Sequence, residues 1–177
     1  ELKDELELHK LFGFIDQLME NIDEGTRRTT RIVRDLQTFT RQDAETFTSS
    51  DLHAVIDSTI TYLDKNLLEH VEIIPAYGSI PLVLCLPGRI SHVFLNIMHN
   101  AIQAMNGEGQ LIIKTYYEKK HVHIIFSDTG CGIDCSDMTK IFDPFFTTKA
   151  VGKGTGLGLG ISHNIVRQHG GIIKVYS

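Results

Sequence analysis

Five glycines occupy every second position from Gly152 to Gly160, and this run restricts the possible folds more than any other stretch of the chain. Glycine has no Cβ, so the backbone here can bend until its amide groups converge on an anion. The helical pattern of residues 161–168 follows directly, and amides at a helix start favour bound phosphate. The run therefore predicts a phosphate site, although a flexible loop before a helix explains it equally well when the run is taken alone.

The spacing of the run excludes the two commonest glycine-rich phosphate loops. A P-loop has Ser or Thr after its Gly-Lys pair, whereas Lys153 is followed by Gly154. A dinucleotide-binding fingerprint needs glycine three residues after Gly156, and that position is Leu159. We therefore expect a third kind of phosphate-binding fold.

A chain of 177 residues can hold one good-sized core with something appended, and 42% hydrophobic with 22% charged residues is ordinary for a soluble globular protein. The net charge of -5 argues against nucleic acid as the main partner. Three cysteines fit neither a disulfide framework nor a zinc site, so we expect a reducing, cytoplasmic location. No apolar run reaches the ~18 residues of a membrane span, so any membrane tether would lie outside these residues.

Apolar and small residues recur at alternating steps of three and four from Leu8 to Phe39. Such a repeat predicts one long helix in a coiled coil or bundle, with partner helices from a second copy or from outside this chain. The repeat stops in residues 42–50, which are rich in Asp, Thr and Ser. We therefore predict two domains, a bundle-forming helix in residues 1–46 and a globular domain in residues 47–177.

The second domain mixes helical and strand patterns. Helical periodicity covers residues 51–69, 88–105 and 161–168. Runs of β-branched and aliphatic residues predict strands over residues 71–75, 82–86, 110–117, 121–127 and 172–176. The strands at 110–117 and 121–127 are close enough in sequence to form a hairpin.

Polar side chains form a stripe along the predicted helix 88–105. Asn96, Asn100 and Gln103 are spaced by four and three residues and lie beside an apolar stripe. Asn is a poor helix former, so two of them one turn apart suggest a function. A polar edge exposed to water is the alternative.

Asp128 directly follows the predicted strand 121–127 and opens the sequence Asp-Thr-Gly-Cys-Gly. An ionised carboxylate accepts hydrogen bonds and donates none, so in a pocket it would select an amine such as that of adenine. Gly130 and Gly132 would let a flat ring approach the backbone. Asp-Thr-Gly is also the signature of aspartic proteases, but only one copy occurs, and that fold is all-β whereas three strong helices are predicted here.

Three phenylalanines, Phe142, Phe145 and Phe146, precede the glycine run. They predict either a small satellite core or the anchored end of a lid that closes on a ligand. Lys149 and Lys153 would travel with such a lid and could meet phosphate charge.

Four motifs occur in the order of the N, G1, F and G2 boxes of sensor histidine kinases, and together they make a highly specific resemblance. They are Asn96-x-x-x-Asn100-Ala101, Asp128-Thr-Gly-Cys-Gly132-Ile133, Phe142-Asp-Pro-Phe145-Phe146-Thr-Thr-Lys149 and Gly154-Thr-Gly156-Leu-Gly158-Leu. Residues 51–177 thus resemble the ATP-binding catalytic domain of that family. Residues 31–39 resemble the second helix of its dimerisation and phosphotransfer hairpin.

The resemblance implies an α+β fold, a two-layer α/β sandwich of the Bergerat ATP-binding type with a mixed sheet and helices on one face. A long bundle-forming helix precedes this domain in the sequence. The resemblance also implies that Asp128 reads adenine, that Asn100 gives an oxygen to Mg²⁺, and that the glycine loop wraps the phosphates of ATP. The residues expected to bind ATP are Asn96, Asn100, Gln103, Asp128, Gly130, Gly132, Ile133, Lys149, Gly154, Thr155, Gly156, Leu157 and Gly158.

Asn96 is the predicted catalytic residue. Related ATPases such as gyrases and heat-shock chaperones carry a glutamate there to activate water, and an amide cannot take that proton. We therefore expect poor hydrolysis and transfer of the γ-phosphoryl group to a histidine instead. The alternatives are a hydrolytic ATPase of the same fold and a degenerate nucleotide-binding and dimerisation module without kinase activity.

The family's acceptor box, a histidine followed by Glu or Asp, is absent, since His9 is followed by Lys10 and lies off the seam. We therefore expect a fragment whose sensor, acceptor helix and last strand lie elsewhere, with no phosphoacceptor histidine in this chain. The expected partners are ATP, a second copy through the N-terminal helix, and the receiver domain of a response regulator, whose aspartate takes the phosphoryl group. A membrane would be reached only through segments absent here.

Overall fold

A computed structural model describes residues 12–19, 22–23, 25–26, 29–30, 46–63, 68–149 and 154–177. The chain divides into two compact units, of which the first comprises Glu1–Arg41 and Lys149–Gly154 and the second Gln42–Thr148 and Thr155–Ser177. The predicted border between residues 46 and 47 lies beside residues 31–45, which are outside the described ranges, and it stays a prediction.

The described residues of the first unit between 12 and 30 are helical, within the long helix predicted from the heptad repeat. Thr26 Oγ1 donates to the Ile22 carbonyl at 2.8 Å, and Thr29 Oγ1 donates to the Gly25 carbonyl at 2.9 Å. Such bonds to the preceding turn are typical of helical threonines. The apolar side chains that this segment exposes are Phe12, Phe14, Ile15, Leu18, Met19 and Ile22.

The second unit contains a mixed sheet. Its strand order is β2 (His70–Tyr77), β4 (Glu108–Glu118) and β5 (His121–Asp128), with β2 parallel and β5 antiparallel to β4. A separate antiparallel pair joins β1 (Thr48–Ser50) to β3 (Val83–Cys85). Lys119 and Lys120 close the predicted β4–β5 hairpin with φ of 51° and 66°, the left-handed backbone of a tight two-residue turn.

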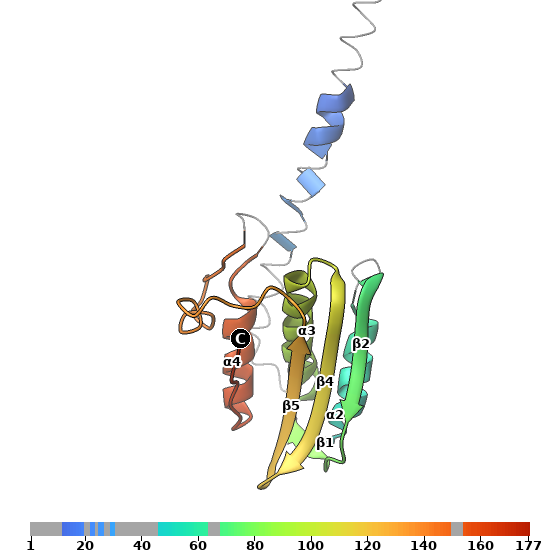
Figure 1. Cartoon of the computed structure of the whole chain (residues 1–177), viewed down its shortest axis with the longest axis vertical. Coiled ribbons are helices and arrows are strands. Elements are labelled where there is room, and N and C mark those ends of the chain that lie inside the picture. The colour runs from blue at the N-terminus through green and yellow to red at the C-terminus, as the bar shows by residue number, and fades with distance from the viewer. Residues whose placement is uncertain are drawn as a thin grey trace, which may run out of the picture. The chain divides into compact units, whose positions relative to one another are not determined.

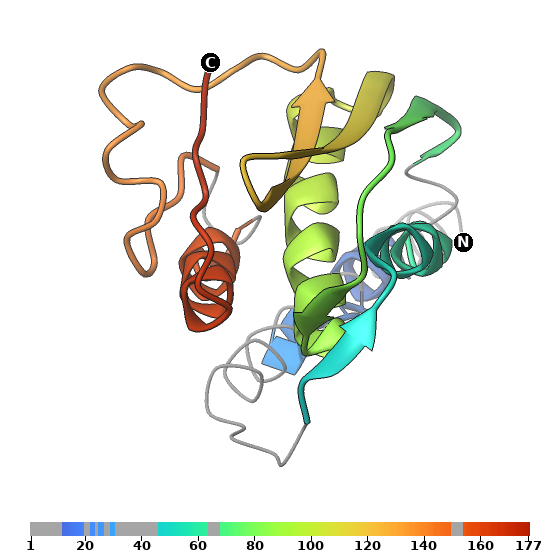
Figure 2. The ribbon, with the colours of Figure 1, turned by 90° about the horizontal axis from the view of Figure 1, so that it is seen from below.

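Three helices lie on one side of this sheet: α2 (Leu52–Thr61), α3 (Pro87–Ala104) and α4 (Gly158–Gln168) (Figure 1). Figure 2 shows α2 and α3 beneath the three-stranded sheet, with α4 beside α3 and past the β5 edge. The core between the layers includes Ile56, Met98, Ile102, Leu111, Ile113, Ile161 and Ile165. The predicted α+β class, a two-layer sandwich with a mixed sheet and helices on one face, is confirmed.

Local chemistry explains where two of the helices begin. The Asp51 side chain accepts from His53 N at 2.9 Å and caps α2, while Pro87, which lacks an N–H, opens α3. The predicted end of the first of these helices at residue 69 was wrong. Tyr62 N and Leu63 N bond three residues back, which tightens the last turn, and α2 ends at Thr61.

Two further strand predictions were wrong. Residues 171–177 have no regular secondary structure, although a strand was expected over 172–176. A strand forms only where its backbone pairs, and in the described part of the second unit the strand ladders do not include this segment. Conversely, no strand was predicted over β1, because its Thr and Ser residues give no apolar signal. Pairing with β3 makes it a strand.

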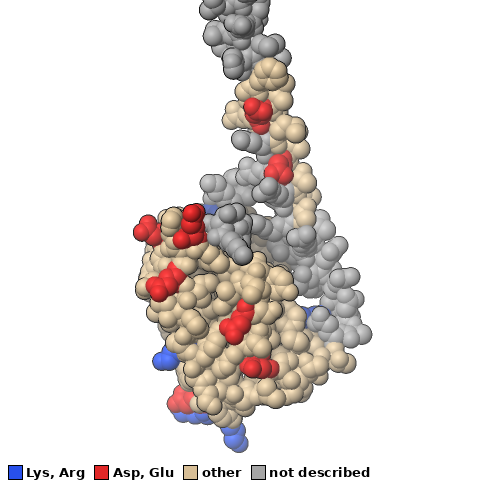
Figure 3. All heavy atoms as spheres, turned by 90° about the vertical axis from the view of Figure 1, so that its right-hand side faces the viewer, with Lys and Arg blue, Asp and Glu red and all other residues tan. Residues whose placement is uncertain are grey.

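Charge is spread thinly over the side of this unit that carries β2 and α2 (Figure 3). Acidic side chains are scattered among uncharged ones there, and basic side chains gather at one end. None of the helices in the described residues is long and apolar enough to cross a membrane.

Candidate functional site

The polar edge of α3 packs against the start of α4. Asn96 Nδ2 donates to the Gly158 carbonyl at 3.3 Å and to Ser162 Oγ at 3.4 Å. One turn further along α3, Asn100 is half-buried on the same edge, and the Gln103 amide lies 3.5 Å from His99 Nε2. The structure therefore brings the predicted asparagine edge together with the helix that follows the glycine run.

Asp128 ends β5 and faces the helix layer. Side chains alternate along a strand, so Asp128 shares a face with Phe126, whose ring centre is 5.6 Å from that of Phe94 on α3. Asp128 Oδ1 accepts from Gly130 N at 2.9 Å. A carboxylate has about four acceptor positions, so this bond leaves capacity for an amine.

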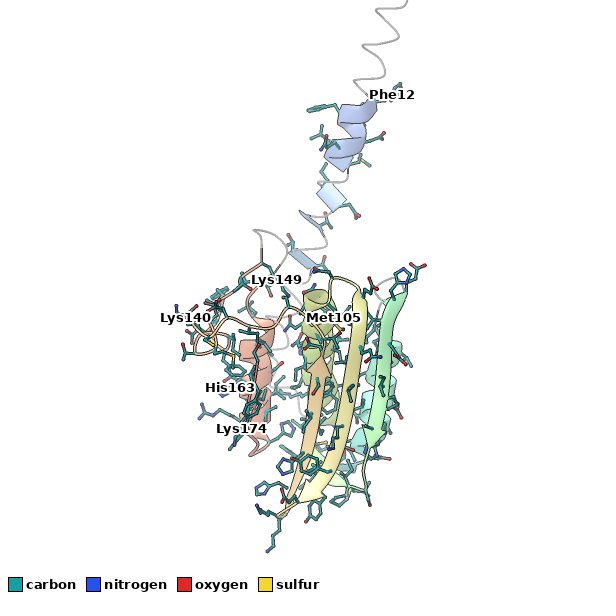
Figure 4. The ribbon with its side chains drawn as sticks, viewed as in Figure 1. Phe12, Met105, Lys140, Lys149, His163 and Lys174 are labelled. Carbon is teal, nitrogen blue, oxygen red and sulfur yellow. The ribbon has the colours of Figure 1, made fainter. Side chains whose placement is uncertain are left out.

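The turn after Asp128 is tied to the last turn of α3 and the start of β4. Cys131 N donates to the Ala104 carbonyl at 3.1 Å, and Thr129 N donates to the Gln110 carbonyl at 3.2 Å. Thr129 Oγ1 accepts from Gln110 N at 3.0 Å and lies 3.5 Å from Met105 Sδ. Figure 4 shows Met105 at this end of α3, beside the strand from which the turn leaves. These bonds fix the Asp128 carboxylate at the carboxyl end of α3.

The glycines of this turn meet two different structural demands. A Cβ on Gly130 would lie 2.7 Å from Ala104 Cβ and 2.7 Å from Asp128 Oδ1, so only glycine fits there. Gly132 has a φ of 74°, which side chains disfavour. Ile133 N, next along, donates to Ser177 Oγ at 2.6 Å.

The phenylalanine motif and the end of the glycine run are joined directly. Phe145 N donates to the Gly156 carbonyl at 2.9 Å, and a Cβ on Gly156 would lie 2.6 Å from the Phe145 carbonyl oxygen. The Phe142 ring lies 5.1 Å from that of His163 on α4. Both ends of the predicted lid are thus held together, which supports a hinge here. The alternate glycines also predict that residues 150–155 are mobile without nucleotide; residues 150–153 lie outside the described residues, so this stays a prediction.

Phe145 has a φ of 68°, and bulky residues rarely adopt this backbone. Its side chain is 71% exposed, so burial of the ring does not offset the strain. The bond to Gly156 holds the strained residue in place. Strain of this kind is commonest in switch regions and ligand clamps.

The remaining predicted residues lie at the borders of this arrangement. Leu157 is buried and directly precedes α4, and its N–H donates to Thr155 Oγ1 at 3.4 Å. Lys149 and Gly154 group with the first unit. Contact with ATP stays a prediction for them, as it does for the other predicted site residues.

The sequence analysis did not predict the contact of Ser162 with Asn96 or the bonds by which Thr129 holds its turn. Ser162 is fully buried on α4, and a polar residue among Ile161 and Ile165 was the available signal. The bonds of Thr129 to Gln110 and Met105 join residues about 20 positions apart, so no local pattern in the sequence indicates them.

Together, a mixed sheet under helices, a carboxylate at a strand end, an amide edge on a helix and a glycine run before the next helix define the Bergerat class of ATP-binding domains. The model of the family described as histidine kinase-, DNA gyrase B- and HSP90-like ATPase matches residues 85–177. The chain belongs to this family, which supports ATP as its nucleotide.

The relatives narrow the resemblance to sensor histidine kinases, as the four motifs predict. Sensor histidine kinase ZraS of Escherichia coli O157:H7 is 34% identical over 167 residues, covering 93% of this chain and 36% of that protein. Signal transduction histidine-protein kinase AtoS of Escherichia coli strain K12 is 49% identical over 89 residues, which is 50% of this chain and 14% of AtoS. The chain therefore spans about a third or less of the curated relatives described here.

Solved structures show the same fold. The catalytic domain of histidine kinase ThkA, in a nucleotide-free form, has a TM-score of 0.63 at 29% identity and covers 70% of this chain and 81% of that chain. Mycobacterial sensor histidine kinase MprB has a TM-score of 0.62 at 24% identity, covering 70% and 80%, and it supports the fold alone.

Proposed function

We propose that this chain is the ATP-binding catalytic part of a sensor histidine kinase. In this proposal it binds ATP with Mg²⁺ and transfers the γ-phosphoryl group to a histidine on a partner helix. That group then passes to an aspartate of a response regulator. The free cysteines Cys85, Cys131 and Cys135 fit the reducing cytoplasm as the place of action.

The placement of Asp128 carries the proposal. Its carboxylate faces the helix layer, is held by Gly130, and stands where the turn is bonded to the end of α3. An acceptor fixed in this way selects the exocyclic amine of adenine, because it has no proton to donate. The tight contact of Gly130 with Ala104 keeps the backbone beside the carboxylate free of side chains, so a flat ring can approach.

The phosphates would lie between the amide edge of α3 and the start of α4. Amides at the start of α4, those of Gly156 and Gly158, can donate to phosphate oxygens, and the helix dipole favours the negative charge of the phosphates. The Asn100 amide provides an oxygen of the kind that Mg²⁺ prefers, and Mg²⁺ usually takes only one or two protein ligands beside phosphates and water. The bound cation would neutralise phosphate charge.

Asn96 determines whether water or a histidine takes the γ-phosphoryl group in this proposal. Its amide donates to α4, and an amide is no base for water, so hydrolysis should be slow. An imidazole nitrogen is nucleophilic near neutral pH, can bond to the γ-phosphorus and releases ADP as the bond to the bridging oxygen breaks. The exposed apolar side chains of residues 12–22 would pack in a homodimer that brings the acceptor helix.

Phosphotransfer to an added helix tests the proposal. The whole chain is mixed with ATP labelled in the γ-phosphate, Mg²⁺ and a helical hairpin that carries a His-Glu box. We expect acid-labile label on the histidine of that hairpin.

The other outcomes separate the alternatives. Absence of ATP binding at millimolar nucleotide would exclude the proposal. Binding without any labelled histidine would favour a non-catalytic module, and rapid release of free phosphate would favour a hydrolytic ATPase.

A further inference from the structure

We infer that Ser162 is a positioning residue of the nucleotide site and that it acts through Asn96. Ser162 lies in α4, has no exposed surface, and its Oγ is 3.4 Å from Asn96 Nδ2. A buried hydroxyl without a partner is destabilising, so the contact has a structural reason to persist. The role of this contact at the site rests on the proposed function.

The contact fixes which end of the Asn96 amide faces α4. The Gly158 carbonyl, 3.3 Å from Asn96 Nδ2, can only accept a hydrogen bond. The end of the amide that faces it must therefore be the NH₂ group, and the second N–H of that group reaches Ser162 Oγ. The two acceptors together commit both protons of the amide to α4.

The same arrangement determines what Asn96 offers to a ligand. With its NH₂ group held by Gly158 and Ser162, the amide has only its carbonyl oxygen left for a ligand. An oxygen attracts a cation or a cation-bound water, whereas an NH₂ group would oppose it. Ser162 should therefore matter for the binding of ATP with Mg²⁺, and little for the binding of ATP alone.

A double-mutant cycle tests this inference on the whole chain. Ser162→Ala should weaken binding of Mg-ATP about fivefold in titration calorimetry, the effect of one lost hydrogen bond, and leave binding in EDTA unchanged. In an Asn96→Ala background, Ser162→Ala should have no further effect. Ser91→Ala is the matched control, because it removes a hydroxyl that bonds Thr59 Oγ1 at 2.8 Å elsewhere on α3.

Nitrogen-15 spectra of the nucleotide-free chain provide a readout independent of binding. The side-chain NH₂ signals of Asn96 should shift and lose protection from exchange in Ser162→Ala, but not in Ser91→Ala. Unchanged signals in a folded variant would overturn the inference. So would equal losses of Mg-ATP affinity with and without Asn96.

Failure of the proposed function can be distinguished from failure of the inference about Ser162. If the unaltered chain binds no ATP, the kinase proposal and the role of Ser162 in binding both fall. The NH₂ signals would then still show whether Ser162 orients Asn96.

Discussion

At the scale of single residues, the proposed function gives Asp128 two tasks. One of its oxygens accepts from Gly130 N and so holds the turn, and the carboxylate must also accept from the amine of adenine. A carboxylate can do both because it has two oxygens and no proton. An amide of the same shape has one oxygen, so it can serve only one of these donors without placing an N–H against another N–H.

Asp128→Asn should therefore weaken ATP binding by more than tenfold, because either Gly130 N or the adenine amine loses its acceptor. Titration calorimetry on the whole chain measures the effect, and thermal unfolding shows whether the variant is folded. Asp134→Asn makes the same chemical change six residues later, at an exposed carboxylate that accepts from Ser136 N, and should leave the affinity unchanged. Similar affinities for Asp128→Asn and the unaltered chain would contradict adenine recognition by Asp128.

At the scale of elements, α2 is held on the sheet by a polar network as well as by its apolar face. Tyr77 of β2 donates its hydroxyl to Asp57 of α2 at 2.8 Å, and its ring stacks on His53 at 4.4 Å. His53 Nε2 in turn lies 2.8 Å from the buried Thr115 Oγ1 of β4. Burial, and then the neighbouring Asp57 carboxylate, raise the pKa of Tyr77 well above its usual value.

This network predicts a stability that depends on Tyr77 in a defined pH range. In the unfolded chain Tyr77 ionises near pH 10, and in the folded chain only at higher pH, so the stabilisation is complete below about pH 10 and is lost as the pH rises further. Tyr77→Phe should lower the free energy of unfolding by about 1 kcal/mol at pH 7. The difference from the unaltered chain should shrink above pH 10.

Urea unfolding at pH 7 and pH 10.5 measures both effects. Tyr62→Phe is the control, because Tyr62 follows α2 and is 73% exposed, so its loss should change little at either pH. A constant difference between Tyr77→Phe and the unaltered chain across this range would show that the pKa of Tyr77 does not contribute.

At the scale of the whole molecule, the two units have different tasks in the proposal. The second unit buries its core between the sheet and three helices and carries most of the residues proposed to bind the nucleotide. The described part of the first unit exposes an apolar stripe that a single helix cannot bury, so it should assemble with other helices. Assembly and nucleotide binding should therefore be separable by substitution.

Leu18→Glu should convert a self-associating chain into a monomer, because it puts a charge on the apolar stripe at a position expected in the seam. Light scattering behind size exclusion measures the mass, and calorimetry should show an ATP affinity within twofold of the unaltered chain. Gln17→Glu, on the neighbouring polar position, is the control and should keep the mass. A monomeric unaltered chain at high micromolar concentration would contradict the predicted homodimer.

The sequence by itself determined the fold class and most of the candidate site. Helix periods, strand runs and the hairpin are local patterns, and the four motifs carry their chemistry in short, fixed spacings such as Asn96 to Asn100 and Asp128 to Gly132. The sheet, the helices and the Asp128 carboxylate at a strand end could therefore be predicted from the sequence.

Only the tertiary structure decided the features that depend on residues far apart in the chain. It made β1 a strand by pairing it with β3, and it left residues 171–177 without a strand. It also set the Asn96 amide against Gly158 and Ser162, more than 60 residues away. Spacing along a chain encodes neighbours within a helix or strand, whereas backbone pairing and the orientation of a buried amide depend on which distant groups the packing brings within hydrogen-bond reach.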